Sequence, residues 1–135
     1  MPTPIHEKFP TACYVVVCRD APDAAGKRKA ATPAHLAHIE RVIDEVRIAG
    51  PLFDEEGRQA IGSLFVFRTQ SASRARELAR MDPYHEAGVW ASVEVLPFYP
   101  AAGTWIGGTT WQAGDVTSRA AGPDSASAGA RESPK

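Results

Sequence analysis

The chain has 135 residues, and its 15 Lys and Arg residues against 16 Asp and Glu residues leave a formal net charge of −1 at pH 7. This length supports about one compact domain of roughly a hundred residues, because the last third of the chain is poor in core-forming residues. The even charge balance gives no overall field that would attract nucleic acid or an anionic membrane, so neither is predicted as a partner.

The two cysteines, Cys13 and Cys18, lie in one apolar run and are separated by an odd number of positions. On a strand this spacing points the two side chains to opposite faces, so they cannot pair within the strand, nor do they form a Cys-x-x-Cys site. The sequence shows no paired-cysteine framework, no charged-then-apolar leader and no apolar run of about eighteen residues. We therefore expect a cytoplasmic protein.

Residues 1–10 are predicted to form a loose N-terminal arm, because they contain prolines and mixed charge and show neither helical nor strand periodicity. The run from Ala12 to Cys18 is continuously apolar and β-branched at its centre, which is typical of a central strand buried on both faces. The composition of Arg19–Gly26 then indicates a turn.

A helix is predicted from about Lys27 to Ile48, because apolar residues recur at intervals of three and four at Leu36, Ile39, Ile43 and Val46. Its start is open. Thr32 and Pro33 are typical of an N-cap and a first helical position, which would put His35 in the first turn. Lys27–Ala31 also contains good helix formers, and a helix that started there would require a kink at Pro33.

The second half of the chain predicts two more strands, a helix and a last strand. A strand over Ile61–Phe67 follows a solvated turn, and a short strand around Arg47–Leu52 would form a hairpin with it. Ser71 opens a helix that runs to about Met81 and is broken by Asp82-Pro83. The alternation over Val89–Phe98 indicates the final strand.

The order β-α-β-β-α-β predicts an α+β, ferredoxin-like domain over residues 11–100, in which two helices cover one face of a four-stranded antiparallel sheet. The other face would carry residues from Tyr14, Val16, Leu64 or Phe65 and from the final strand. Such an apolar patch is larger than monomers usually expose. We therefore predict a homodimer that packs sheet on sheet.

Residues 101–135 are rich in Gly, Ser, Ala, Thr and Pro and show no apolar period, so most of this segment is predicted to be a flexible tail. Trp105, Ile106 and Trp111 surround Gly107-Gly108 and are the exceptions. They either dock on the body or on a partner subunit, or stand in solvent.

His35 is the first candidate for chemistry, since imidazole is the side chain best suited to proton transfer in both directions near neutral pH. The competing interpretation makes His35 and His38 boundary residues at the edges of the apolar stripe. Asp82 also has two interpretations. It is either the N-cap of a short turn that begins at Pro83, or it accepts a hydrogen bond from His35 and leaves the other ring nitrogen free as base and acid.

These residues form part of a resemblance that extends from about Cys13 to Phe98. The pieces resemble, in order and spacing, the YciI-like (YCII-related) family, and they are Tyr14–Val17, Pro33–Leu36, Ala49–Leu52, Gly62–Leu64, Asp82–Tyr84 and Ala87–Val89. The resemblance implies a ferredoxin-like dimeric α+β barrel and a His-Asp active site, which maps onto His35 and Asp82. The known enzymatic precedent is a dehydrochlorinase of chlorinated hydroxyquinol breakdown.

Three further residues are predicted to bind a substrate. Many relatives have a basic residue where this chain has Thr32, and Arg28 lies on the same helix face as His35 if the helix is continuous, so Arg28 is expected to supply the anion contact. Ser63 and Tyr84 are expected to line the pocket. The four histidines and the acids show no metal-ligand spacing, and no glycine-rich phosphate loop is present, so neither a metal nor a cofactor is predicted.

Two functions follow from these observations. The first is a small, cofactor-independent acid-base enzyme of the lyase, isomerase or dehydrochlorinase type, acting through His35 and Asp82 on a small, aromatic or enolisable substrate. The second is a non-catalytic module of the same fold that binds a small ligand or a partner.

Overall fold

The computed structural model describes residues 2–5 and 11–111 of the chain. The chain divides into two units, Met1–Phe98 and Tyr99–Lys135, which are described separately. Most of the predicted arm (residues 1 and 6–10) and most of the predicted tail (residues 112–135) lie outside the described residues.

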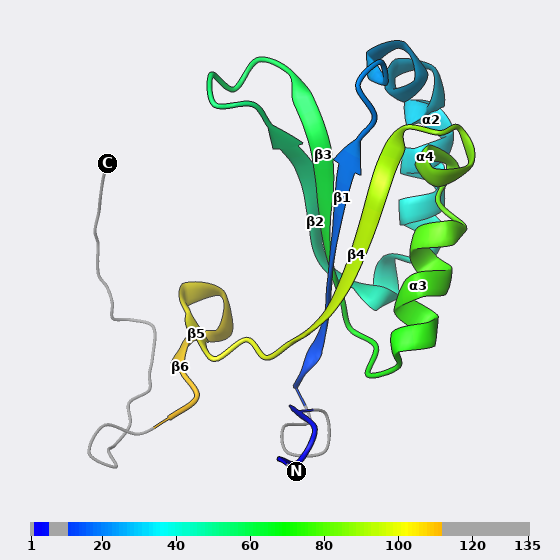
Figure 1. The fold of residues 1–135 in the computed structure, drawn as a ribbon. Helices are drawn as coiled ribbons and strands as arrows, with labels where there is room; N and C mark the ends of the chain where they lie inside the picture. Colours follow the sequence, from blue (N-terminus) through cyan, green and yellow to red (C-terminus); the bar gives the residue numbers. More distant parts are fainter. Residues whose placement is uncertain (1, 6–10, 112–135) are drawn as a thin grey trace. The chain divides into compact units, whose positions relative to one another are not determined.

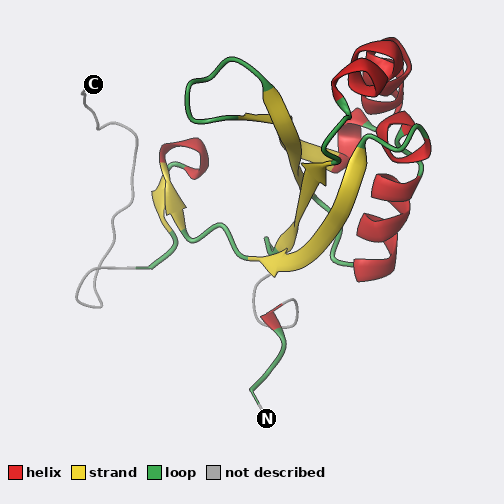
Figure 2. Ribbon diagram, turned by 45° about the horizontal axis from the view of Figure 1, so that its top comes forward, coloured by secondary structure: helices red, strands yellow, loops and turns green. Residues whose placement is uncertain are grey.

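The first unit contains a four-stranded antiparallel sheet whose strand order is β2-β3-β1-β4. Its strands are β1 (Cys13–Asp20), β2 (Val46–Phe53), β3 (Ala60–Phe67) and β4 (Trp90–Phe98). The helices α2 (Ala25–Arg41), α3 (Ala72–Arg80) and α4 (Pro83–Glu86) all lie on one side of this sheet (Figure 1; Figure 2), and a short 3-10 turn, η1 (Ile43–Glu45), connects α2 to β2. This arrangement confirms the predicted α+β, ferredoxin-like fold.

The core lies between the sheet and the helices. Strand alternation directs Tyr14, Val16 and Cys18 of β1 and Phe65 and Phe67 of β3 into it. The open face of the sheet therefore carries the residues between them. This corrects the sequence analysis, which assigned Tyr14, Val16 or Phe65 to the exposed face.

The open face of the sheet remains apolar. It carries Val15 and Val17 of β1, Leu64 and Val66 of β3, and Leu96 of β4, which pairs with Val15. Leu96 is 45% exposed and the other four are half-buried. The helices of the first unit all lie on the other side of the sheet (Figure 1), and this apolar face is the feature on which the dimer prediction depends.

Helix α2 begins at Ala25, so Pro33 lies inside the helix; of the two starts that the sequence left open, the one near Lys27 is close to the observed start. It ends at Arg41, and the residues that the sequence analysis placed in its last turns form η1 and β2 instead. Inside the helix, the Thr32 hydroxyl donates to the Arg28 carbonyl at 2.7 Å, a local bond that Thr often makes within helices.

The inward face of α2 also differs from the predicted stripe. His38 is buried and Leu36 is 53% exposed, whereas the sequence analysis placed Leu36 on the inner face and His38 at its edge. Arg28, His35 and His38 recur at intervals of seven and three and share the face that packs toward the sheet. Ile39 of the predicted stripe does pack against the core, but the polar residues on this face explain why the apolar pattern placed Leu36 there as well.

Helices α3 and α4 begin as their sequences predict. The Ser71 hydroxyl caps α3 by accepting from the Arg74 backbone N–H at 3.1 Å. Asp82 caps α4 by accepting from the Tyr84 backbone N–H at 2.9 Å, and Pro83 takes the first helical position.

The second unit contains two short paired strands, β5 (Ala102–Gly103) and β6 (Gly108–Thr109), on either side of the 3-10 turn η2 (Thr104–Ile106). Trp105 is 83% exposed and Trp111 is 55% exposed. That these tryptophans dock on the body or on a partner stays a prediction. Within the described part of the chain, no helix has the length and apolar character needed to span a membrane.

Candidate active site

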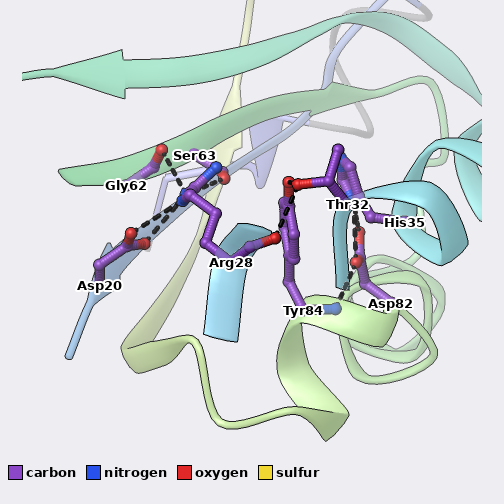
Figure 3. A network of polar contacts seen from close by, with 8 residues as sticks. All are labelled: Asp20, Arg28, Thr32, His35, Gly62, Ser63, Asp82 and Tyr84. Carbon is purple, nitrogen blue, oxygen red and sulfur yellow. Dashed lines mark hydrogen bonds and ion pairs between the residues drawn. The ribbon is translucent and has the colours of Figure 1, made fainter. Parts of the chain in front are cut away.

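A cavity of about 300 Å³ lies between α2 and the strands β2 and β3. Its walls are formed by Arg28, Thr32, His35, Leu36, Ile39, Ala49, Gly50, Pro51, Ser63, Phe65 and Tyr84. We call it the His35 cavity. One part of this wall is apolar, and the other carries the polar network drawn in Figure 3.

His35 and Asp82 are in direct contact in this network. The Nδ1 atom of His35 lies 2.8 Å from Oδ1 and 2.9 Å from Oδ2 of Asp82. Asp82 is 1% exposed, whereas the His35 ring reaches the cavity. The 47 positions that separate the two residues are bridged because α2 and α4 pack against each other.

The Asp82 carboxylate performs two tasks that the sequence analysis treated as alternatives. Its Oδ1 accepts from the Tyr84 N–H as the cap of α4 and also lies against His35. An ionised carboxylate only accepts hydrogen bonds, so the proton of the neutral imidazole belongs on Nδ1. The lone pair is then on Nε2, which makes no hydrogen bond with any described residue.

The Tyr84 ring stacks on the imidazole ring of His35 and limits its rotation. The two rings are stacked, with centroids 3.9 Å apart and an angle of 12° between planes. The guanidinium carbon of Arg28 lies 4.7 Å from the centroid of the same phenol ring, and in Figure 3 Tyr84 stands between Arg28 and His35. Such a cation over an aromatic face is favourable.

The Tyr84 hydroxyl proton is already committed. The Thr32 hydroxyl donates its only hydrogen to the Arg28 carbonyl, so its oxygen can only accept from the Tyr84 hydroxyl 2.8 Å away. The phenol oxygen keeps its lone pairs. Toward the cavity, Tyr84 is therefore an acceptor.

Arg28 is held by a largely buried ion pair with Asp20 at the end of β1, in which the two side chains are 13% and 8% exposed. Its Nε and Nη2 donate to the two Asp20 oxygens at 2.9 and 3.0 Å, and this bonding raises the pKa of Arg28. Nη2 also donates to the Gly62 carbonyl at 2.9 Å and to Ser63 Oγ at 3.1 Å. Arg28 is thus a fixed cation, compensated by Asp20, at the wall of the cavity, and the anion contact that the sequence analysis expected of it stays a prediction.

Ser63 has the opposite polarity to Tyr84. Because Arg28 can only donate, Ser63 Oγ accepts that bond and its own O–H remains available. The cavity therefore offers a donor at Ser63 and acceptors at the Tyr84 oxygen and His35 Nε2. This pattern fits a small molecule with hydroxyl or carbonyl groups on an apolar frame.

Position 62 requires glycine because β3 and β1 approach each other closely there. A Cβ at this position would collide with the backbone carbonyl oxygen of Cys18 on β1. The absence of a side chain lets β3 approach β1 closely where the Gly62 carbonyl and Ser63 meet Arg28.

Cys18 lies beneath the network and is fully buried. Burial, together with the nearby Asp82 and Asp20 carboxylates, raises the pKa of its thiol to about 12. A thiol in this environment stays protonated at neutral pH and is no nucleophile.

All five residues proposed from the sequence, His35, Asp82, Arg28, Ser63 and Tyr84, meet in this network. Sequence reasoning missed Asp20, because its partner Arg28 lies eight positions away across a turn and no local pattern links them. It also missed the role of Thr32 in the network, because Thr32 was considered as an N-cap and as a departure from a basic residue. Among the residues described, no group of three or more His, Cys, Asp or Glu side chains is placed to hold a metal ion.

Comparison with known proteins gives three findings. Residues 12–99 match the model of the YCII-related domain family. Protein YciI of Escherichia coli is 36% identical over 92 residues, and an uncharacterized Haemophilus influenzae protein is 37% identical over 92 residues. Each match covers 63% of this chain and 94% of the relative.

Among solved structures, a similar one is 5-chloro-2-hydroxyhydroquinone dehydrochlorinase from Burkholderia phenoliruptrix, in complex with 2,5-dihydroxybenzoquinone. The TM-score is 0.59 at 21% identity, and the match covers 69% of this chain and 97% of the other. At this identity the likeness supports the fold.

Proposed function

This chain belongs to the YCII-related domain family, and we propose that it is a small, cofactor-independent acid-base enzyme in which His35 transfers a proton to and from a small substrate. The observation that carries the proposal is the contact of His35 Nδ1 with both oxygens of the buried Asp82, with the ring of His35 at the wall of a cavity.

The contact assigns a role to each residue of the pair. Asp82 holds the proton of His35 on Nδ1 and directs the basic Nε2 away from itself. When Nε2 takes a proton from a substrate, the imidazolium that forms lies against a buried carboxylate, which stabilises it. The same nitrogen then returns the proton at another atom of the substrate.

The walls of the cavity suggest the substrate class. A planar, apolar frame would lie against Leu36, Ile39 and Phe65, and its hydroxyl or carbonyl groups would meet Ser63 and Tyr84. Proton transfer on such a molecule corresponds to a lyase, an isomerase or a dehydrochlorinase. The dehydrochlorinase of similar fold was solved with a quinone of this type, which makes 5-chloro-2-hydroxyhydroquinone a reasonable first substrate to assay.

The test is turnover by wild type, His35→Gln and Asp82→Asn. General acid-base assistance contributes on the order of a hundredfold or more, so His35→Gln should lose at least about that factor while a distant control, Arg41→Gln, keeps the wild-type rate. If His35→Gln and Asp82→Asn turn over a substrate as fast as wild type, the proposal is wrong.

A binding module is the alternative, and the polar groups at Ser63 and Tyr84 favour it, because they can hold a ligand without any proton transfer. In that case 2,5-dihydroxybenzoquinone or another ligand would bind with an affinity that is unchanged in His35→Gln and lower in Ser63→Ala. Turnover and binding measured on the same variants separate the two functions.

The assembly is also part of the proposal. We expect two copies to pack through the open apolar face that carries Val15, Val17, Leu64, Val66 and Leu96. Leu96→Glu should give a monomer in light scattering after gel filtration, whereas Glu94→Gln, a control at the neighbouring open-face position, should not. A cytoplasmic location accords with Cys13 and Cys18, which are not joined in a disulfide.

A further inference from the structure

A second cavity, of about 250 Å³, lies outside the His35 cavity. It is lined by Arg76, Ala79 and Arg80 of α3, His85 of α4, and Val93 and Val95 of β4. We call it the arginine cavity. Nothing in the acid-base site uses any of these residues.

The two arginines of this cavity lack carboxylate partners. Within residues 2–5 and 11–111, the ion pairs of arginine join Arg28 to Asp20 and Arg74 to Glu45 and Glu77, and none involves Arg76 or Arg80. The contrast lies within one helix. Arg74 of α3 is paired with two carboxylates, whereas Arg76 and Arg80 on the cavity side are paired with no carboxylate of a described residue.

Neither Glu77 nor Glu94 faces the cavity. Glu77 is bound to Arg74 at 2.8 Å, and Glu94 lies between Val93 and Val95 on β4 and so points to the other face of the sheet. Arg76 and Arg80 are one helical turn apart and on the same side of α3, so their like charges repel each other. An anion between them would relieve this repulsion.

The rest of the cavity wall is apolar. Ala79 is buried, and Val93 is 37% exposed beside Val95 on the strand below. The His85 ring adds a nitrogen that can donate a hydrogen bond from α4. A site with two guanidinium groups above and valine side chains below suits a ligand with an anionic head and a short apolar body.

We propose that the arginine cavity binds a small organic anion, whose carboxylate or phosphate is held by Arg76 and Arg80 and whose apolar part rests on Val93 and Val95. Guanidinium groups match both kinds of anion, because their planar fork donates two parallel hydrogen bonds. The site is separate from the proposed catalytic groups, so this proposal can be tested independently of the acid-base function.

The experiment is a titration of the full chain followed by backbone amide NMR, with three probes added separately: hexanoate, acetate and inorganic phosphate. We expect shifts confined to residues 76–85 and 93–95. Hexanoate should bind more tightly than acetate, because only hexanoate reaches the valines. Phosphate binding as tightly as hexanoate would identify the head group as phosphate.

The variants decide whether the cavity is the site. Arg76→Gln/Arg80→Gln should weaken binding by about tenfold or more, since each arginine contributes a charged hydrogen bond. Arg41→Gln/Arg58→Gln removes the same charge at exposed positions outside both cavities and should leave binding unchanged.

Three outcomes would overturn the proposal. They are no shift near residues 76–85 with any probe, equal weakening by both double variants, and equal binding of acetate and hexanoate. The first would show that no anion binds at the cavity. The second would show that binding depends only on the net charge of the protein. The third would show that the valines contribute nothing to binding.

Discussion

The His35 cavity and the arginine cavity lie on the same side of the sheet, but their charges are compensated differently. In the first, Arg28 is paired with Asp20 and His35 with Asp82, and the carboxylate side chains are 8% and 2% exposed. In the second, Arg76 and Arg80 have no carboxylate partner among the described residues. The charged groups of the His35 cavity are thus held in place by other residues of the chain, whereas the arginine cavity, as proposed, would be completed by a bound anion.

Preorganisation of this kind is what proton transfer requires. A donor or base that is already oriented does not have to be rearranged during the reaction. The same compensation makes the His35 cavity sensitive to the loss of any one partner, because a buried charge is then left alone. Four predictions compare groups at this site with exposed groups elsewhere in the chain, and they are given in order of decreasing effect.

Asp20→Ala should have the largest effect, because it leaves the buried Arg28 guanidinium without its counter-ion. Breaking a buried pair in this way costs about 3–5 kcal/mol, measured as the free energy of unfolding in urea at fixed protein concentration. Asp23→Ala is the matched control, since the Asp23 carboxylate is exposed and lies 4.0 Å from Lys27. Equal effects of the two substitutions would mean that the Arg28 pair is not buried in solution.

Gly62→Ala should be next, at about 1–3 kcal/mol, because its methyl group collides with the Cys18 carbonyl and the strands must separate. Gly50→Ala on the edge strand β2 meets no atom within 4 Å and serves as control. We also expect Gly62→Ala to disturb the Arg28 side chain, visible as a shift of its Nε resonance. A Gly62→Ala protein as stable as Gly50→Ala would contradict the close approach of β1 and β3.

Substitution of Asp82 separates its two tasks. Asp82→Asn keeps an N-cap oxygen for α4, whereas Asp82→Ala loses it and should cost about 1 kcal/mol more. Nitrogen-15 NMR of the neutral imidazole should show the proton of His35 on Nδ1 in wild type and a loss of that preference in Asp82→Ala. His85, which has no carboxylate partner among the described residues, is the internal reference; a wild-type His35 with its proton on Nε2 would refute the assignment.

The pair of Glu45 and Arg74 should show the smallest effect. Hydrogen bonding to Arg74 holds the pKa of Glu45 below its ordinary value of 4.5, so the stabilisation is complete above that pH and is lost as the pH falls below it. Because both side chains are 34% exposed, we expect at most about 1 kcal/mol. The measurement compares wild type and Glu45→Gln between pH 7 and 3, and a difference that grows as the pH falls would contradict it.

Most of the fold could be predicted from the sequence because its strands and capped helices carry local signals. The face of α2 that turns toward the sheet could not be predicted fully, because it includes Arg28, His35 and His38 where a core helix would carry apolar residues. The sequence stripe of Leu36, Ile39 and Ile43 contains residues that are largely exposed: Leu36 at the His35 cavity, and Ile43 beyond the end of the helix. The candidate site itself thus caused the error.

The candidate site was predictable only in part for a similar reason. His35 and Asp82 stood out through their motifs, but the contact between them depends on the packing of α2 against α4, which no spacing along the chain encodes. Asp20 and the commitment of the Tyr84 proton to Thr32 became visible only when three elements were placed together.

Helix α4 has only four residues, and two adjacent residues within it, Tyr84 and His85, line different cavities. Successive helical residues are rotated by about 100°, so one inserted or deleted residue after Asp82 would turn both side chains by that angle, away from the cavities that they now line. Point substitutions at His85 leave that geometry intact. Among related sequences, the segment from Asp82 to His85 should therefore stay constant in length.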